Sequence, residues 1–89
     1  ELIVTANGKK IPPQKIEALL KQIPFVSQAL LYGDGKPYCV ALITIDELQV
    51  KEAKNPLPAE KRHSLIWSHV ERINKELASF EQLKKIHIL

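Results

Sequence analysis

The sequence predicts a small α+β domain: a projecting N-terminal β-hairpin, then a small, mainly antiparallel sheet of about three strands covered by two amphipathic helices. Three observations support this prediction. Apolar runs typical of strands alternate with runs of helical period, turn-forming residues separate them, and the composition, 45% hydrophobic and 26% charged, is that of a globular protein. A length of 89 residues suits one domain, assigned here to 1–89, with the hairpin at 2–12 and the core at 13–89.

The opening segment predicts the hairpin. Residues 2–5 form a β-type run, and the Asn7-Gly8 pair that follows favours a tight reversal, because both residue types tolerate positive φ. Residues 9–11 would form the return strand, and Pro12 would end the pairing because proline has no N–H to donate. The hairpin holds few apolar residues, so we expect it to lie outside the core.

The next segment predicts a helix over residues 13–22. Pro13 suits the first helical turn, and Pro24 stops the helix. Four apolar residues recur at helical spacing and would form the buried face of this helix: Ile16, Leu19, Leu20 and Ile23.

Two strands are predicted at 28–32 and 38–45, joined by a loop at 33–37 that is rich in turn-forming residues. Their short separation favours an antiparallel pair. The second strand is almost continuously apolar, so we expect it to be central in the sheet and covered on both faces.

The remaining third of the chain predicts one more helix and one more strand. Residues 46–60 have no clear period, although a helical turn near Leu48 fits the sequence. A helix is predicted over 59–78, with Trp67 as a core anchor, and a final strand over 84–89. The buried stripe of the helix would be Ile66, Val70, Ile73 and Leu77.

The residue chemistry predicts neither a self-contained active site nor a metal centre. His63 and His69 lie about 240° apart around their helix, so they cannot share a metal ion. His87 belongs to a separate strand, with no cysteine or carboxylate at ligand spacing. Cys39, the single cysteine, lies inside an apolar strand and is expected to be a small core residue, since a nucleophilic thiol needs exposure.

The hairpin is the one segment that suggests a ligand. Its glycine turn is flanked by Thr5, Lys9 and Lys10, which places a small backbone and two cations on a protrusion. Such a loop suits close approach to a phosphate-bearing molecule bound elsewhere. A purely structural hairpin is the alternative interpretation.

Residues 1–17, with the sequence ELIVTANGKKIPPQKIE, form the most specific motif of the chain. Further matching stretches are residues 26–29, 32–38, 41–43 and 80–86, together with Trp67 within its long helix. On these residues the chain closely resembles the C-terminal domain of the AMP-forming acyl-CoA synthetases, within the adenylate-forming enzymes, and is most similar to the long-chain fatty-acid–CoA ligase branch.

The resemblance implies a mobile lid on a larger N-terminal domain that binds ATP with Mg²⁺ and the fatty acid. The lid first closes for formation of acyl-AMP, then rotates so that coenzyme A can attack. In the second state the hairpin would enter the active site and line the coenzyme A channel. The residues that match this hairpin are Thr5, Ala6, Asn7, Gly8 and Lys9. Lys10 matches a position near the nucleotide phosphate, and Glu17 matches a helix glutamate expected to be structural.

The resemblance also implies that no catalytic residue lies within these 89 residues. The lysine that assists adenylation is expected after Leu89, so the chain alone is predicted to be inactive and to bind neither ATP nor coenzyme A tightly. No apolar run approaches the roughly 18 residues of a membrane span. The implied location is cytoplasmic, with membrane contact at most peripheral.

Two other classes of protein stay open from the sequence. A net charge of +3 allows a small basic module that binds nucleic acid, but the aromatic residues are too dispersed for a binding face, so no nucleic-acid partner is expected. A regulatory domain that binds a metabolite by itself is the second alternative. Within the resemblance, a luciferase-like or peptide-synthetase relative also fits.

Overall fold

The computed structural model describes residues 2–54 and 57–89 and confirms the predicted α+β class. Glu1, Asn55 and Pro56 lie outside the described residues; the last two belong to the segment expected to lack a clear period. The elements, in chain order, are β1 (Ile3–Val4), β2 (Lys10–Ile11), α1 (Pro13–Lys21), β3 (Val26–Tyr32), β4 (Cys39–Ile45), α2 (Glu47–Glu52), η1 (Ala59–Lys61), α3 (Arg62–Asn74), η2 (Ser79–Glu81) and β5 (Leu83–Ile88).

The main sheet is mixed, with strand order β3-β4-β5. β3 and β4 pair antiparallel, as predicted from the short loop between them, whereas β4 and β5 pair parallel. The parallel pair follows from the connection, because the chain passes through α2, η1 and α3 between these strands and returns to the same end of the sheet. The sheet is therefore less antiparallel than the sequence suggested.

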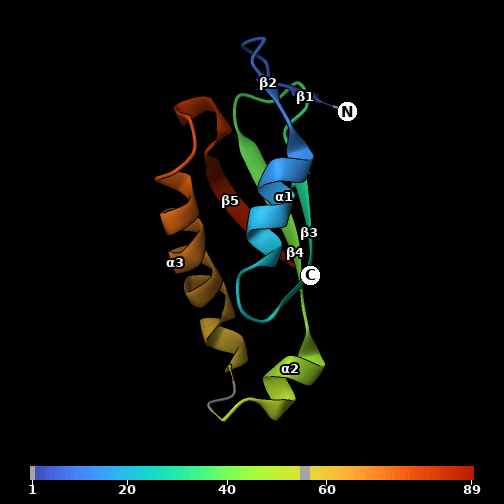
Figure 1. Cartoon of the computed structure of the whole chain (residues 1–89), viewed down its shortest axis with the longest axis vertical. Coiled ribbons are helices and arrows are strands. Elements are labelled where there is room, and N and C mark those ends of the chain that lie inside the picture. The colour runs from blue at the N-terminus through green and yellow to red at the C-terminus, as the bar shows by residue number, and fades with distance from the viewer. Residues whose placement is uncertain (1, 55–56) are drawn as a thin grey trace.

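Both long helices cover the same face of this sheet (Figure 1). Alternate residues of β4 are buried beneath them, whereas the residues between are only half-buried. The opposite face carries Leu30 and Tyr32, which are 57% and 52% exposed. The expectation that β4 is covered on both faces is therefore wrong. An almost continuous apolar run does not distinguish full cover from one buried face and one apolar open face.

The base of the N-terminal hairpin belongs to the core, contrary to the expectation that the whole hairpin would stand outside it. Ile11 is completely buried and Ile3 is 8% exposed, and both are members of the central hydrophobic cluster. These two apolar residues are enough to bring the base of the hairpin into the core, because they are paired directly across β1 and β2 and enter the same cluster. The tip of the hairpin projects at one end of a molecule 44 Å long (Figure 1).

The second long helix is shorter than predicted. Residues 59–61 form η1, and α3 ends at Asn74 rather than near residue 78. The Asn74 side chain both accepts from the Leu83 backbone N–H, at 2.9 Å, and donates to the Leu83 carbonyl, at 3.0 Å. Leu77 is buried beyond the helix, and Ile73, expected at the centre of the buried stripe, is only half-buried.

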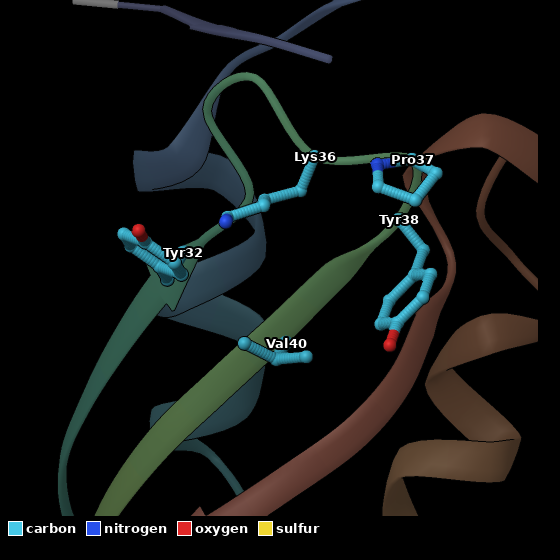
Figure 2. Close-up of a pocket in the computed structure, with 5 residues that line it drawn as sticks. All are labelled: Tyr32, Lys36, Pro37, Tyr38 and Val40. Carbon is cyan, nitrogen blue, oxygen red and sulfur yellow. The ribbon is translucent and has the colours of Figure 1, made fainter. Parts of the chain in front are cut away.

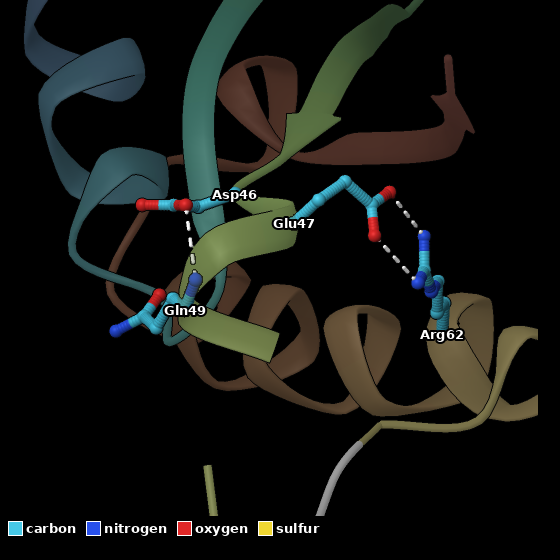
Figure 3. Close-up of polar contacts among 4 residues, drawn as sticks. All are labelled: Asp46, Glu47, Gln49 and Arg62. Carbon is cyan, nitrogen blue, oxygen red and sulfur yellow. Dashed lines mark hydrogen bonds and ion pairs between the residues drawn. The ribbon is translucent and has the colours of Figure 1, made fainter. Parts of the chain in front are cut away.

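The segment near Leu48 forms the short helix α2, where at most one turn was expected. Asp46 caps it by accepting from the Gln49 backbone N–H at 3.1 Å. Glu47 and Arg62 form a bidentate ion pair with N–O distances of 2.7 and 2.9 Å (Figure 3). This pair ties α2 to the start of α3, at the end of the molecule opposite the hairpin (Figure 1).

Candidate functional site

The hairpin tip is a closed three-residue loop, Ala6 to Gly8. The Thr5 N–H donates to the Lys9 carbonyl at 2.9 Å, and the Gly8 N–H donates to the Thr5 carbonyl at 2.9 Å. The Thr5 hydroxyl also accepts from the Lys9 N–H at 3.2 Å. Gly8 has φ +78°, so this position uses the left-handed region that glycine occupies at least cost, as in a turn followed by a one-residue bulge.

The structure separates the predicted hairpin residues into two groups. Thr5 is buried, at 6% exposure, and its polar groups hold the loop closed. The other five residues are exposed and form the outward surface of the tip: Ala6, Asn7, Gly8, Lys9 and Lys10. The Lys9 ammonium lies 5.6 Å from the centroid of the Phe80 ring, which places the η2 segment beside the hairpin.

The loop between β3 and β4 also lies against the hairpin, a contact that the sequence analysis missed. The Ala6 N–H donates to the Lys36 carbonyl at 2.8 Å, and the Gly35 N–H donates to the Val4 carbonyl at 2.8 Å. Asp34 Oδ1 accepts from the Val4 N–H at 3.0 Å. The glycines and proline of residues 33–37 signalled a turn, but no local pattern signals its partner.

A surface cavity of about 260 Å³ opens next to this loop. Its lining residues are Tyr32, Lys36, Pro37, Tyr38 and Val40. Figure 2 shows the two tyrosine rings on either side of Val40, with the Lys36 side chain extending toward Tyr32. Lys36 thus adds an exposed cation in the loop that bonds the hairpin. An ammonium beside two aromatic rings suits a ligand that joins an anionic group to an apolar or planar one.

Neither Cys39 nor His63 lines this cavity. Cys39 is completely buried, and burial raises the pKa of its thiol, with a further rise from the Glu81 carboxylate. The prediction of a core cysteine is therefore confirmed. His63 stacks on Trp67, at 6.5 Å between ring centroids. Trp67 is half-buried against the core rather than central in it.

Within residues 2–54 and 57–89, no three histidine, cysteine or acidic side chains gather as metal ligands would. In the same residues, no helix combines the length and the apolar character needed to cross a bilayer. The hairpin end offers exposed backbone, cations and aromatic rings, and these groups can bind and position a ligand.

Comparison with known proteins points to one family. A family model described as the AMP-binding enzyme C-terminal domain matches residues 1–89. The chain is similar to long-chain-fatty-acid–CoA ligase FadD15 of Mycobacterium tuberculosis, with 52% identity over 46 residues, which are 52% of this chain and 8% of that protein. It is also similar to long-chain-fatty-acid–CoA ligase heimdall of Drosophila melanogaster, with 38% identity over 68 residues, 75% of this chain and 10% of that protein.

A solved structure shares the fold. The adenylation domain of a carboxylate reductase from Mycobacterium chelonae superimposes with a TM-score of 0.76 at 24% identity, covering 99% of this chain and 14% of that one. The matched part of this chain corresponds to only about a tenth of the two ligases named above, 8% and 10% of their lengths.

Proposed function

This chain belongs to the family of AMP-binding enzyme C-terminal domains, and from that premise we propose that it is the mobile C-terminal domain of an AMP-forming long-chain fatty-acid–CoA ligase. Its partner would be the N-terminal domain of the same enzyme, with fatty acid, ATP with Mg²⁺, and coenzyme A as substrates. The hairpin tip would enter the active site for thioester formation, after acyl-AMP has formed.

The observation that carries this proposal is the exposed, closed hairpin tip at one end of the domain. Its loop is held by three hydrogen bonds through Thr5, so Gly8 and its neighbours present a fixed backbone to the outside. Glycine at the tip lets that backbone approach a bound chain closely, since no side chain intervenes.

The charge of this end of the domain fits the proposed ligands. Lys9, Lys10 and Lys36 are all exposed there, and ATP and coenzyme A both carry several phosphates. Lys10 is our candidate for contact with a nucleotide phosphate. The cavity beside Lys36 would accommodate an apolar or planar part of the same ligand.

The open face of the sheet supports a docking role. Leu30 and Tyr32 are more than half exposed, and half-buried Val40 and Leu42 pair with them on β4. These four residues form an apolar patch on β3 and β4, beside Lys85 and His87 of β5, and such a patch is typical of a protein–protein contact. We propose that the N-terminal domain covers this patch in one of the two closed states.

We also propose that the enzyme is cytoplasmic, with at most peripheral contact to membranes.

Gly8→Leu in the intact enzyme tests the hairpin assignment. A Cβ at Gly8 would lie more than 4 Å from every atom of this domain outside its two chain neighbours, so the leucine side chain would begin in open space where another domain or a ligand could approach. A residue with a side chain loses about 1 kcal/mol by adopting the positive φ of this position, and this cost is the same in the state that forms acyl-AMP and in the state that forms the thioester. Formation of acyl-AMP should survive within a few-fold, whereas thioester formation should fall at least about 100-fold, or roughly 2.7 kcal/mol of barrier.

The two half-reactions are followed separately, by pyrophosphate exchange and by single-turnover transfer from preformed acyl-AMP. Gly8→Ala is the matched control, because it carries the same backbone cost with little bulk and should lose far less. Equal losses in both half-reactions would mean that Gly8 serves only the fold. The 89 residues alone are expected to release no pyrophosphate, since the nucleotide site would lie in the partner domain.

A further inference from the structure

We infer that the loop between β3 and β4 is the element that orients the hairpin, and that Asp34 is a positioning residue for the thioester step. This inference rests on the proposed function of the hairpin. Asp34 would touch neither substrate nor cofactor, and it would act through Val4 and the strand that leads to the tip.

The hairpin cannot hold its own orientation. β1 and β2 are two residues each, and an isolated two-stranded ribbon is marginally stable even when it is longer. Its base is fixed in the core through Ile11, but residues 6–10 are exposed. Contacts with residues outside the two strands must therefore fix the direction in which the tip points.

The loop supplies three hydrogen bonds to the hairpin. Asp34 Oδ1 and the Gly35 N–H bond the two backbone groups of Val4, at 3.0 and 2.8 Å, in the way that a third strand would. The Lys36 carbonyl accepts from the N–H of Ala6, the first residue of the tip, at 2.8 Å. The loop therefore bonds the hairpin both at its stem and at its tip.

The loop is in turn fixed to the core. A Cβ at Gly33 would lie 3.0 Å from the sulfur of Cys39, which is completely buried at the start of β4. Gly35 has φ +70°, a conformation that side chains rarely adopt, and its N–H donates to the Val4 carbonyl. The backbone path from β4 through the loop to the hairpin is thus set by packing at one end and by hydrogen bonds at the other.

Asp34 bonds the hairpin through its side chain, whereas the other two bonds use backbone groups of the loop. Its bond can therefore be removed by a substitution that leaves the backbone groups in place. Asp34→Ala removes the acceptor for the Val4 N–H, whereas Asp34→Asn keeps a carbonyl oxygen at the same place. In the intact enzyme, Asp34→Ala should raise amide hydrogen exchange across residues 2–10 by about tenfold or more, and Asp34→Asn should stay within a few-fold of the unchanged enzyme.

The half-reactions provide the second measurement. Asp34→Ala should slow single-turnover thioester formation by about tenfold or more and leave pyrophosphate exchange within a few-fold, with recovery in Asp34→Asn. Asp46→Ala is the matched control, because it removes the same kind of aspartate–backbone bond, 3.1 Å to the Gln49 N–H, at the opposite end of the domain. It should change neither the exchange of residues 2–10 nor either half-reaction.

Unchanged amide hydrogen exchange of residues 2–10 in Asp34→Ala would overturn the inference. Equal rates of thioester formation in Asp34→Ala and Asp34→Asn would overturn it as well. Failure of the proposed function is distinguishable, because it would appear in Gly8→Leu as equal losses in both half-reactions. A selective loss in Gly8→Leu together with no effect of Asp34→Ala would leave the hairpin assignment standing and remove the orienting role of the loop.

Discussion

The Glu17 carboxylate, on α1, accepts a hydrogen bond from the backbone N–H of Leu31, on the edge strand β3, at 2.8 Å. At the other edge of the sheet, Asn74 of α3 bonds both backbone groups of Leu83 on β5. Each helix that covers the sheet therefore also sends a polar side chain to an edge strand. Such bonds occupy backbone groups that would otherwise be open to pairing with another chain.

Glu17→Ala should destabilise the isolated domain by about 1–3 kcal/mol, because it leaves the partly buried Leu31 N–H without its acceptor. Glu17→Gln retains a carbonyl oxygen and should lose markedly less. The measurement is urea unfolding of the 89-residue chain, which we expect to be cooperative with about 5–10 kcal/mol of stability. Absence of a cooperative transition would show that the domain needs its neighbour, and equal stability of the two variants would show that the bond contributes nothing.

Two isoleucines of α3 should respond differently to the same substitution. Ile66 is completely buried, so Ile66→Ala should cost about 2–5 kcal/mol. Ile73 lies half-buried beside a surface cavity of about 240 Å³, so Ile73→Ala should cost under about 2 kcal/mol. Urea unfolding of both variants checks the difference, and a larger loss at Ile73 would place the buried stripe where the sequence alone predicted its centre.

The ion pair between Glu47 and Arg62 should make stability depend on acid pH. The hydrogen bonds from Arg62 hold the pKa of Glu47 below its usual 4.5 in the folded chain. The stabilisation is therefore present above pH 4.5 and is lost as the pH falls through the lowered pKa. Arg62→Ala should flatten this part of the stability profile.

Urea unfolding at several values between about pH 6 and about pH 3 measures that profile. Arg62→Lys is the control for charge, since lysine keeps the cation but cannot form the two parallel bonds. The pH dependence should also weaken in high salt, because the pair lies at the surface. Identical profiles for the unchanged chain and Arg62→Ala would show that the pair adds no pH-dependent stability.

The Cys39 thiol should be unreactive in the folded chain. It is completely buried and its pKa is raised, so the thiolate is scarce and inaccessible. Reaction with a chromogenic disulfide reagent at about pH 8 should proceed only as fast as the domain opens, and should accelerate in urea. Ser64→Cys, at an exposed position of α3, should add one thiol that reacts promptly. Prompt reaction of Cys39 itself would contradict the placement of β4.

Elements with a strong local period could be predicted from the sequence. The helix expected over 13–22 is Pro13–Lys21, and the strand expected over 38–45 is Cys39–Ile45. Both depend on interactions within one segment: the spacing of apolar residues, and prolines that begin or stop a helix. The hairpin and its family motif could be predicted for the same reason, because the turn residues and the matching residues are consecutive.

What the sequence missed depends on residues far apart in the chain. The parallel pairing of β4 with β5 required the length and path of the connection, and the burial of Ile11 required the whole core. The bond from Asp34 to Val4 joins residues 30 positions apart, and no local pattern of either segment encodes it. The sequence by itself therefore determined where the hairpin and its matching residues lie, whereas the tertiary structure alone decided which loop bonds the hairpin, because only folding brings the two segments together.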